Sequence, residues 1–155
     1  MRGAPSLDAA IEAGKPRLLY MLFCDWYSQT REQKSNFMGV FDSMTVGPQE
    51  THARNFWLCF RTLGTMGEGL QIVVYSPENV PIAQLKFAGT PDPDSPPGTP
   101  RYFDGAIQGS IPIAAAGLYW FAAFFKEELL GGNGFRIIRR VSDEDGGTHG
   151  DAGNP

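Results

Sequence analysis

The chain has no apolar run long enough to cross a membrane as a helix. Its most apolar stretch, Leu18 to Cys24, is seven residues long, whereas a membrane-spanning helix needs about 20. Asp8 and Glu12 precede this stretch and no small-residue cleavage site follows it, so the pattern of a secretory signal peptide is missing. We therefore expect a cytoplasmic protein that does not act on a membrane.

Cysteine is scarce. The only two, Cys24 and Cys59, lie within apolar segments and form no C-x-x-C pair, which excludes a zinc ribbon or a thioredoxin-type redox site. In a cytosolic protein such residues usually behave as small buried hydrophobes, and this is our prediction for both. A disulfide between them stays open, because the sequence does not give the distance between their Cα atoms.

Histidine is equally scarce, and this limits the catalytic possibilities. His52 and His149 have no second ligand at metal spacing, and no serine lies in a G-x-S-x-G elbow. We predict no metal, no cofactor and no identifiable catalytic residue. We rank an enzyme of unrecognised type below two non-enzymatic hypotheses, an interaction module and a ligand-binding domain, which are described below. The acids or bases available to such an enzyme are His52, Asp25 and Asp42.

The chain has no excess of positive charge. It holds 13 Lys and Arg against 17 Asp and Glu, a net charge of −4, and four of the acids fall in residues 142–155, which contain no Lys or Arg. The rest of the chain is balanced, whereas nucleic-acid-binding domains usually carry a basic excess; we predict no nucleic-acid partner. Residues 142–155 have too few apolar side chains to order. We expect a loose arm over 1–14, one domain over 15–141 and a disordered acidic tail over 142–155.

The remaining sequence consists of short apolar and aromatic runs separated by turn residues, which is typical of an all-β protein. The expected strands are 17–27, 37–46, 55–62, 69–76, 80–88, 105–113, 117–126 and 134–141. No segment between them is long enough for a crossover helix. We predict an antiparallel β-sandwich of about eight strands with jelly-roll or immunoglobulin-like topology. A helix over 114–130 is the competing interpretation, but its run of aromatic residues favours a strand.

Glycine and proline mark the expected connections. The segment GTMGEG, 64–69, precedes a strand rather than a helix, so we interpret it as a hairpin loop and not as a phosphate-binding loop. The segment GGNG, 131–134, is expected to form a turn between the last two strands. Residues 89–100 are rich in proline and must form a loop, because proline lacks the N–H that a sheet interior needs.

Two groups of charged residues have ordinary interpretations. Asp92, Asp94 and Asp104 could together offer oxygen ligands to calcium, but acids placed between prolines are also common in solvated loops. The three arginines between 136 and 140 suit a solvated edge strand, where charge discourages aggregation. Neither group changes the prediction of no metal and no nucleic acid.

Two expected strands are apolar on both faces. Along 18–27 and 118–125, aromatic side chains occur at odd and at even positions, whereas a two-sheet sandwich buries only one face of each strand. The N-terminal arm, the loop 89–104 or another protein chain must cover the second face, because large exposed apolar patches are unusual in monomers. We predict a non-enzymatic interaction or assembly module that self-associates. The interface candidates are Tyr20, Trp26, Tyr119 and Phe121.

The alternative is a sandwich or barrel that binds a small apolar ligand. In that case the second apolar face lines a cavity and not an interface. Substitution of an aromatic residue on this face distinguishes the two hypotheses. Disruption of an interface leaves a folded protein with a smaller assembly mass, whereas disruption of a cavity unfolds the protein or removes a co-purifying ligand.

Three segments together resemble a family of small bacterial proteins that is catalogued only as a domain of unknown function. They are LLYMLFCDWY at 18–27, NFMGVFDSM at 36–44 and GLYWFAAFF at 117–125, and the resemblance covers about residues 17–141. It implies a compact β-rich domain with no assigned activity, cofactor or catalytic residue. Asp25 and Asp42 match motif positions, and we expect each at a strand end in a turn or cap hydrogen bond.

Deletion of residues 142–155 tests the prediction for the tail. Because this segment has little apolar surface to bury, we expect the thermal midpoint of the shortened protein to match that of the full chain. The isoelectric point should rise from about 5.1. Calorimetry and isoelectric focusing measure the two quantities, and a large drop in the midpoint would mean that the tail docks on the domain.

Overall fold

The computed structural model describes residues 15–65, 68–88 and 102–142, and in these ranges the chain is all-β. The predicted arm 1–14, the proline-rich loop 89–100 and all but the first residue of the predicted tail lie outside the described residues. None of the described residues forms a helix that could span a membrane. The described ranges form nine strands: β1 (Arg17–Gln29), β2 (Ser35–Phe41), β3 (Ser43–Val46), β4 (Phe56–Leu63), β5 (Leu70–Tyr75), β6 (Pro81–Lys86), β7 (Tyr102–Gly109), β8 (Gly117–Phe125) and β9 (Glu128–Arg139).

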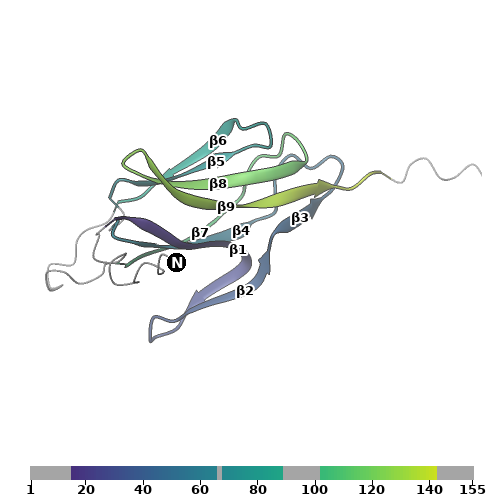
Figure 1. Ribbon diagram of the computed structural model, residues 1–155. Helices are drawn as coiled ribbons and strands as arrows, with labels where there is room; N and C mark the ends of the chain where they lie inside the picture. The colour runs from purple at the N-terminus through teal and green to yellow at the C-terminus, as the bar shows by residue number, and fades with distance from the viewer. Residues whose placement is uncertain (1–14, 66–67, 89–101, 143–155) are drawn as a thin grey trace, which may run out of the picture.

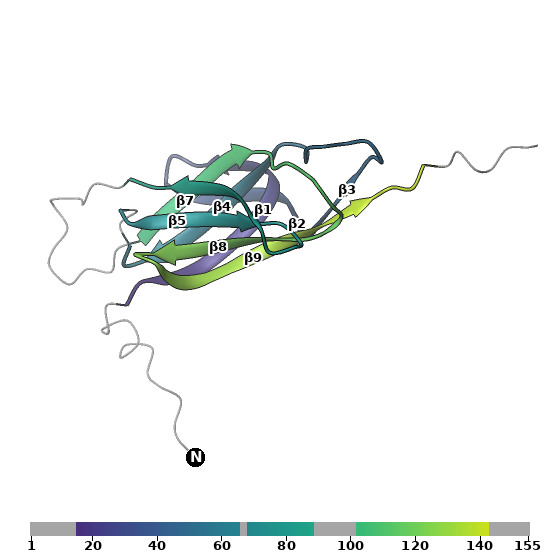
Figure 2. The ribbon, with the colours of Figure 1, turned by 90° about the horizontal axis from the view of Figure 1, so that it is seen from above.

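The strands form two stacked sheets, so the predicted β-sandwich is confirmed (Figures 1 and 2). Sheet A has the order β2-β1-β4-β7, and sheet B has the order β3-β9-β8-β5-β6. The hairpins are β1–β2, β5–β6 and β8–β9. The other connections pass from one sheet to the other, as they do in jelly-roll and immunoglobulin-like sandwiches.

Four phenylalanine rings pack between the sheets, and we call Phe23, Phe56, Phe121 and Phe135 the phenylalanine cluster. Phe23 and Phe56 come from sheet A, and the other two come from sheet B. Their ring centroids lie 4.7 to 6.2 Å apart, in tilted and edge-to-face arrangements, which is the spacing that aromatic pairs prefer. All four are at most 3% exposed. This cluster is the centre of the core.

One predicted strand is two strands in the structure. The run 37–46 is broken at Asp42, with β2 in sheet A and β3 in sheet B. β3 pairs with β9 in parallel, and the backbone N–H of Arg136 donates to the carbonyl of Asp42. The prediction of a wholly antiparallel protein missed this pair. The reason is physical: a residue between two apolar runs looks the same in sequence whether the chain continues straight or crosses to the other sheet.

Both predicted glycine turns are corrected by the structure. Residues 131–134 lie inside β9, and the β8–β9 turn falls instead at Lys126 and Glu127, whose φ angles of 47° and 71° are those of a two-residue hairpin turn. The 64–69 segment links β4 of sheet A to β5 of sheet B, so it is a connection between sheets and not a hairpin loop. The residue types of Lys126 and Glu127 gave no indication that these residues adopt positive φ angles, because glycine and asparagine are the usual residues there.

The β1–β2 hairpin bends sharply and folds over the outside of sheet A. Figure 1 shows the second half of β1 turning away from the first half, with β2 beside it. Gly39, at φ 66°, lies opposite Asp25 at the bend, and a Cβ atom there would overlap the Asp25 carboxylate. Beyond the bend, the rings of Tyr27 and Phe37 reach Trp57 and Tyr20, both on the outer face of sheet A, at 5.6 and 5.9 Å.

Replacement of Gly39 by alanine tests the bend. A side chain at positive φ is strained, and here it also displaces Asp25, so we expect a loss of about 1–3 kcal/mol in the free energy of unfolding. Urea denaturation measures it. Gly109→Ala is the control, because its Cβ meets nothing within 4 Å. Equal stability of the two variants would contradict a strained bend.

Candidate functional site

Two of the four predicted interface residues are buried in the core. Tyr119 is 0% exposed and Phe121 2% exposed; Phe121 belongs to the phenylalanine cluster, and the Tyr119 hydroxyl donates to the carbonyl of Ala115 at 2.8 Å. The prediction of Tyr119 and Phe121 as contact residues is therefore wrong. Both faces of this segment are aromatic, so composition could not say which face points inward. The residues that point outward are the neighbours Leu118, Trp120 and Phe124.

The other two candidates lie at the β1–β2 hairpin. Tyr20 is half-buried on the outer face of sheet A, where the curled hairpin contacts it through Phe37. Trp26 is 51% exposed and is paired with Met38, which is also exposed. The chain itself therefore covers much of the outer face of β1. Trp26 stays available for contact, and Tyr20 only in part.

The two cysteines lie together beneath this hairpin. Cys24 and Cys59 are 0% and 1% exposed, both thiols are free, and their sulfur atoms are 3.9 Å apart. Burial raises the pKa of Cys24 and raises the pKa of Cys59 to about 12, because a thiolate is poorly solvated there. The prediction of two buried thiols is confirmed. Such thiols are protonated at neutral pH and are poor nucleophiles.

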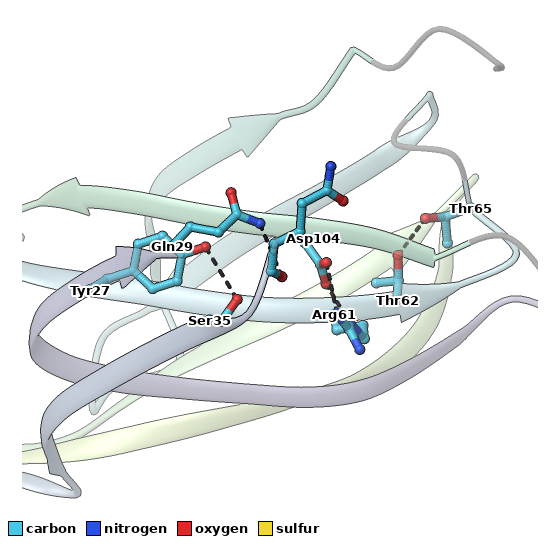
Figure 3. Close-up of polar contacts among 8 residues, drawn as sticks. Tyr27, Gln29, Ser35, Arg61, Thr62, Thr65 and Asp104 are labelled. Atoms are coloured by element: carbon cyan, nitrogen blue, oxygen red, sulfur yellow. Dashed lines mark hydrogen bonds and ion pairs between the residues drawn. The ribbon is translucent and has the colours of Figure 1, made fainter. Parts of the chain in front are cut away.

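A charged pair lies beside the thiols on the same face. Arg61 of β4 donates to both carboxylate oxygens of Asp104 on β7, at 2.6 and 2.9 Å (Figure 3). The hydrogen bonds from Arg61 to Asp104 raise the pKa of the guanidinium. Burial and the nearby Asp104 carboxylate raise the pKa of Tyr20. Of the three acids weighed for calcium, Asp104 is thus engaged by arginine, and Asp92 and Asp94 lie outside the described residues.

The remaining candidate acids and bases are dispersed. Asp25 lies inside β1, at its bend, and not at the strand end that was predicted, because β1 continues to Gln29; it accepts a hydrogen bond from Arg54 at 2.9 Å. Asp42 lies between β2 and β3, where the chain crosses between sheets. His52 is exposed, its ring shares a hydrogen bond with the hydroxyl of the adjacent Thr51, and its backbone forms an isolated β-bridge with Pro112. In the described ranges, no three His, Cys, Asp or Glu residues gather in a way that could hold a metal ion. The geometry brings none of these groups together into a catalytic arrangement.

The arginines of the last strand have a structural role at one position. Arg139 donates from one guanidinium nitrogen to the backbone carbonyls of Gly47, Pro48 and Glu50, at 2.9 to 3.2 Å. It therefore fastens the loop after β3 to β9. Arg136 and Arg140 are exposed, as predicted for a solvated strand.

The outer face of sheet B carries an exposed apolar surface, which we call the outer strip. It consists of Tyr75, Leu118, Trp120, Phe124 and Leu129. Leu118, Trp120 and Leu129 are 41–58% exposed. Four of the five residues, all but Leu118, line a shallow hollow of about 350 Å³ together with Asn79 and Ala122. Figure 2 looks down on sheet B, with the strands of sheet A behind it.

Two glycines shape the outer strip. The Trp120 indole lies across Gly132 and Gly134 of β9, and a Cβ at either position would come within 2.9 Å of its ring atoms. The indole therefore lies close to the sheet. Gly132 and Gly134 are two residues apart and therefore lie on the same face of β9, and this spacing is a sequence signal that the turn interpretation overlooked.

A second hollow opens between the two sheets, at the side where edge strands β6 and β7 face each other. Its volume is about 160 Å³, and its deepest walls include Phe56, Leu58 and Phe121 of the core.

Comparison with protein-family models and with curated proteins gives no match to this chain. The resemblance to a bacterial family of unknown function stays a prediction.

The buried thiols make the stability depend on alkaline pH. The unfolded chain loses the Cys59 proton near the ordinary pKa of 9.0, whereas the folded chain holds it to about 12. The free energy of unfolding should therefore fall as pH rises from about 9 towards 12. Urea denaturation at several pH values measures this fall, and Cys59→Ala should reduce it. An unchanged pH dependence in the variant would mean that the thiol does not contribute.

Proposed function

We propose that the protein is a non-enzymatic interaction module that self-associates through the outer strip of sheet B. The observation that carries the proposal is the contiguous exposed apolar surface of Leu118, Trp120 and Leu129 beside Tyr75 and Phe124. Scattered exposed apolar residues are normal, but a contiguous group marks a contact surface. Tryptophan and tyrosine are also the residues that most often dominate binding energy at interfaces.

The occupant that this surface suits best is a second copy of the chain. The strip has no charged residue, and the charged side chains of the same face, Lys86 and Arg136, lie on neighbouring strands at its edges. This arrangement, apolar at the centre and polar at the rim, is that of protein interfaces. Excluding the acidic tail, the chain carries equal numbers of positive and negative residues, so net charge does not oppose the approach of two copies.

Face-to-face packing of two sheets gives such a dimer a simple geometry. Sheets stack about 10 Å apart when the side chains between them interdigitate. Because Gly132 and Gly134 have no side chains, the Trp120 indole lies close to the backbone of sheet B, which favours such close stacking. A two-fold axis through the strip would place the same residues of each copy in contact. The hollow between Tyr75 and Phe124 would then receive side chains from the partner.

Replacement of Trp120 by aspartate tests the interface. A charge at the centre of the strip must be desolvated on association, so we expect the variant to be a folded monomer of 17.0 kDa where the unaltered chain is larger. Light scattering coupled to gel filtration, at micromolar concentration, measures the mass. Circular dichroism checks that the variant is folded.

Trp26→Asp is the matched control. Trp26 is 51% exposed and Trp120 is 41% exposed, but Trp26 lies on the β1–β2 hairpin, away from sheet B. We expect it to leave the assembly state unchanged. Dissociation by Trp26→Asp alone would move the interface to the hairpin, where Tyr20 and Trp26 were predicted to act. A monomeric unaltered chain would overturn self-association.

A further inference from the structure

The hollow between β6 and β7 is separate from the outer strip and reaches into the core. β6 is the edge strand of sheet B and β7 the edge strand of sheet A, and they do not pair with each other. The side of the sandwich between them is therefore not closed by hydrogen bonds among the described strands. The hollow opens at this side and ends against core side chains, so it is a pocket between the sheets and not a depression on a sheet face.

The lining of this pocket is almost entirely apolar. Its walls are Phe56, Leu58, Val74, Ala83, Leu85, Ile107, Ile111 and Phe121. Two lining residues, Gln108 and Ser110, have polar side chains. Gln108 lies on the same face of β7 as Asp104, which faces away from the space between the sheets, and the Ser110 hydroxyl already donates to the carbonyl of Ala53. Water held inside needs two to four polar partners. The walls do not provide them, so the interior favours apolar atoms.

We propose that this pocket binds a small apolar molecule, about the size of a single aromatic ring or a short branched alkyl chain. The volume of about 160 Å³ sets the size, because an apolar cavity of about 150 Å³ in another protein stays dry and holds benzene. It is too small for a drug-sized ligand, which occupies about 300 Å³ or more.

Toluene is the probe that tests the pocket. Titration of the full-length protein with toluene, followed by calorimetry and by the thermal midpoint, should give saturable binding and a midpoint that rises with toluene concentration. Ala83 lines the pocket from β6. Ala83→Leu should fill the space and weaken toluene binding at least tenfold.

Gln84→Leu is the matched control. Gln84 is the next residue of β6, is exposed, and bonds to Gln71 on the outer face of sheet B. The same leucine there adds apolar surface outside the pocket and should leave toluene affinity unchanged. Trp120→Asp should leave it unchanged as well, so that the outcome is independent of whether the chain self-associates.

A second variant keeps the test decisive if Ala83→Leu does not fold. Leu85 also lines the pocket, and Leu85→Ala should enlarge it so that a two-ring probe, naphthalene, gains affinity at least tenfold over its affinity for the unaltered protein. Absence of saturable toluene binding to the unaltered chain would overturn the proposal. So would toluene binding that survives in a folded Ala83→Leu variant, because the site would then lie elsewhere.

Discussion

The packing of the phenylalanine cluster between the two sheets is the constraint on which the rest of the structure depends. Phe23, Phe56, Phe121 and Phe135 come from four strands, and their rings meet at 4.7 to 6.2 Å. Because side chains alternate along a strand, placing one phenylalanine inward fixes the direction of every neighbour. Phe121 inward sends Trp120 outward, and Phe23 inward sends Cys24 to the outer face.

The two outer faces of the sandwich differ in whether the chain itself covers them. On sheet A, the bend at Asp25 and Gly39 brings Tyr27 and Phe37 over the outer side chains, and the buried thiols of Cys24 and Cys59 lie beneath them. This local third layer explains how β1 can be apolar on both faces. On sheet B, the corresponding face of β8 stays exposed among the described residues, and glycines lie beneath its tryptophan. The asymmetry is the reason for placing self-association on sheet B.

Sequence patterns predicted the sandwich, most of its strands and the burial of both cysteines, because these follow from apolar periodicity and from composition. They did not predict the break at Asp42, the turn at Lys126 and Glu127, or the strand through residues 131–134. At each of these places the local residues fit two conformations equally well. GGNG suits a turn, and it also suits a strand on which an indole must lie flat; only Trp120 on the neighbouring strand decides between them.

The sequence by itself determined that the chain is all-β, that its net negative charge arises from residues 142–155, and that two strands are apolar on both faces. Those properties are local, and periodicity and composition express them directly. Only the tertiary structure decided that Tyr119 and Phe121 point inward, that the hairpin covers the thiols, and that a pocket opens between β6 and β7. Each of these depends on which strands become neighbours, and contacts between strands distant in the chain leave no local pattern.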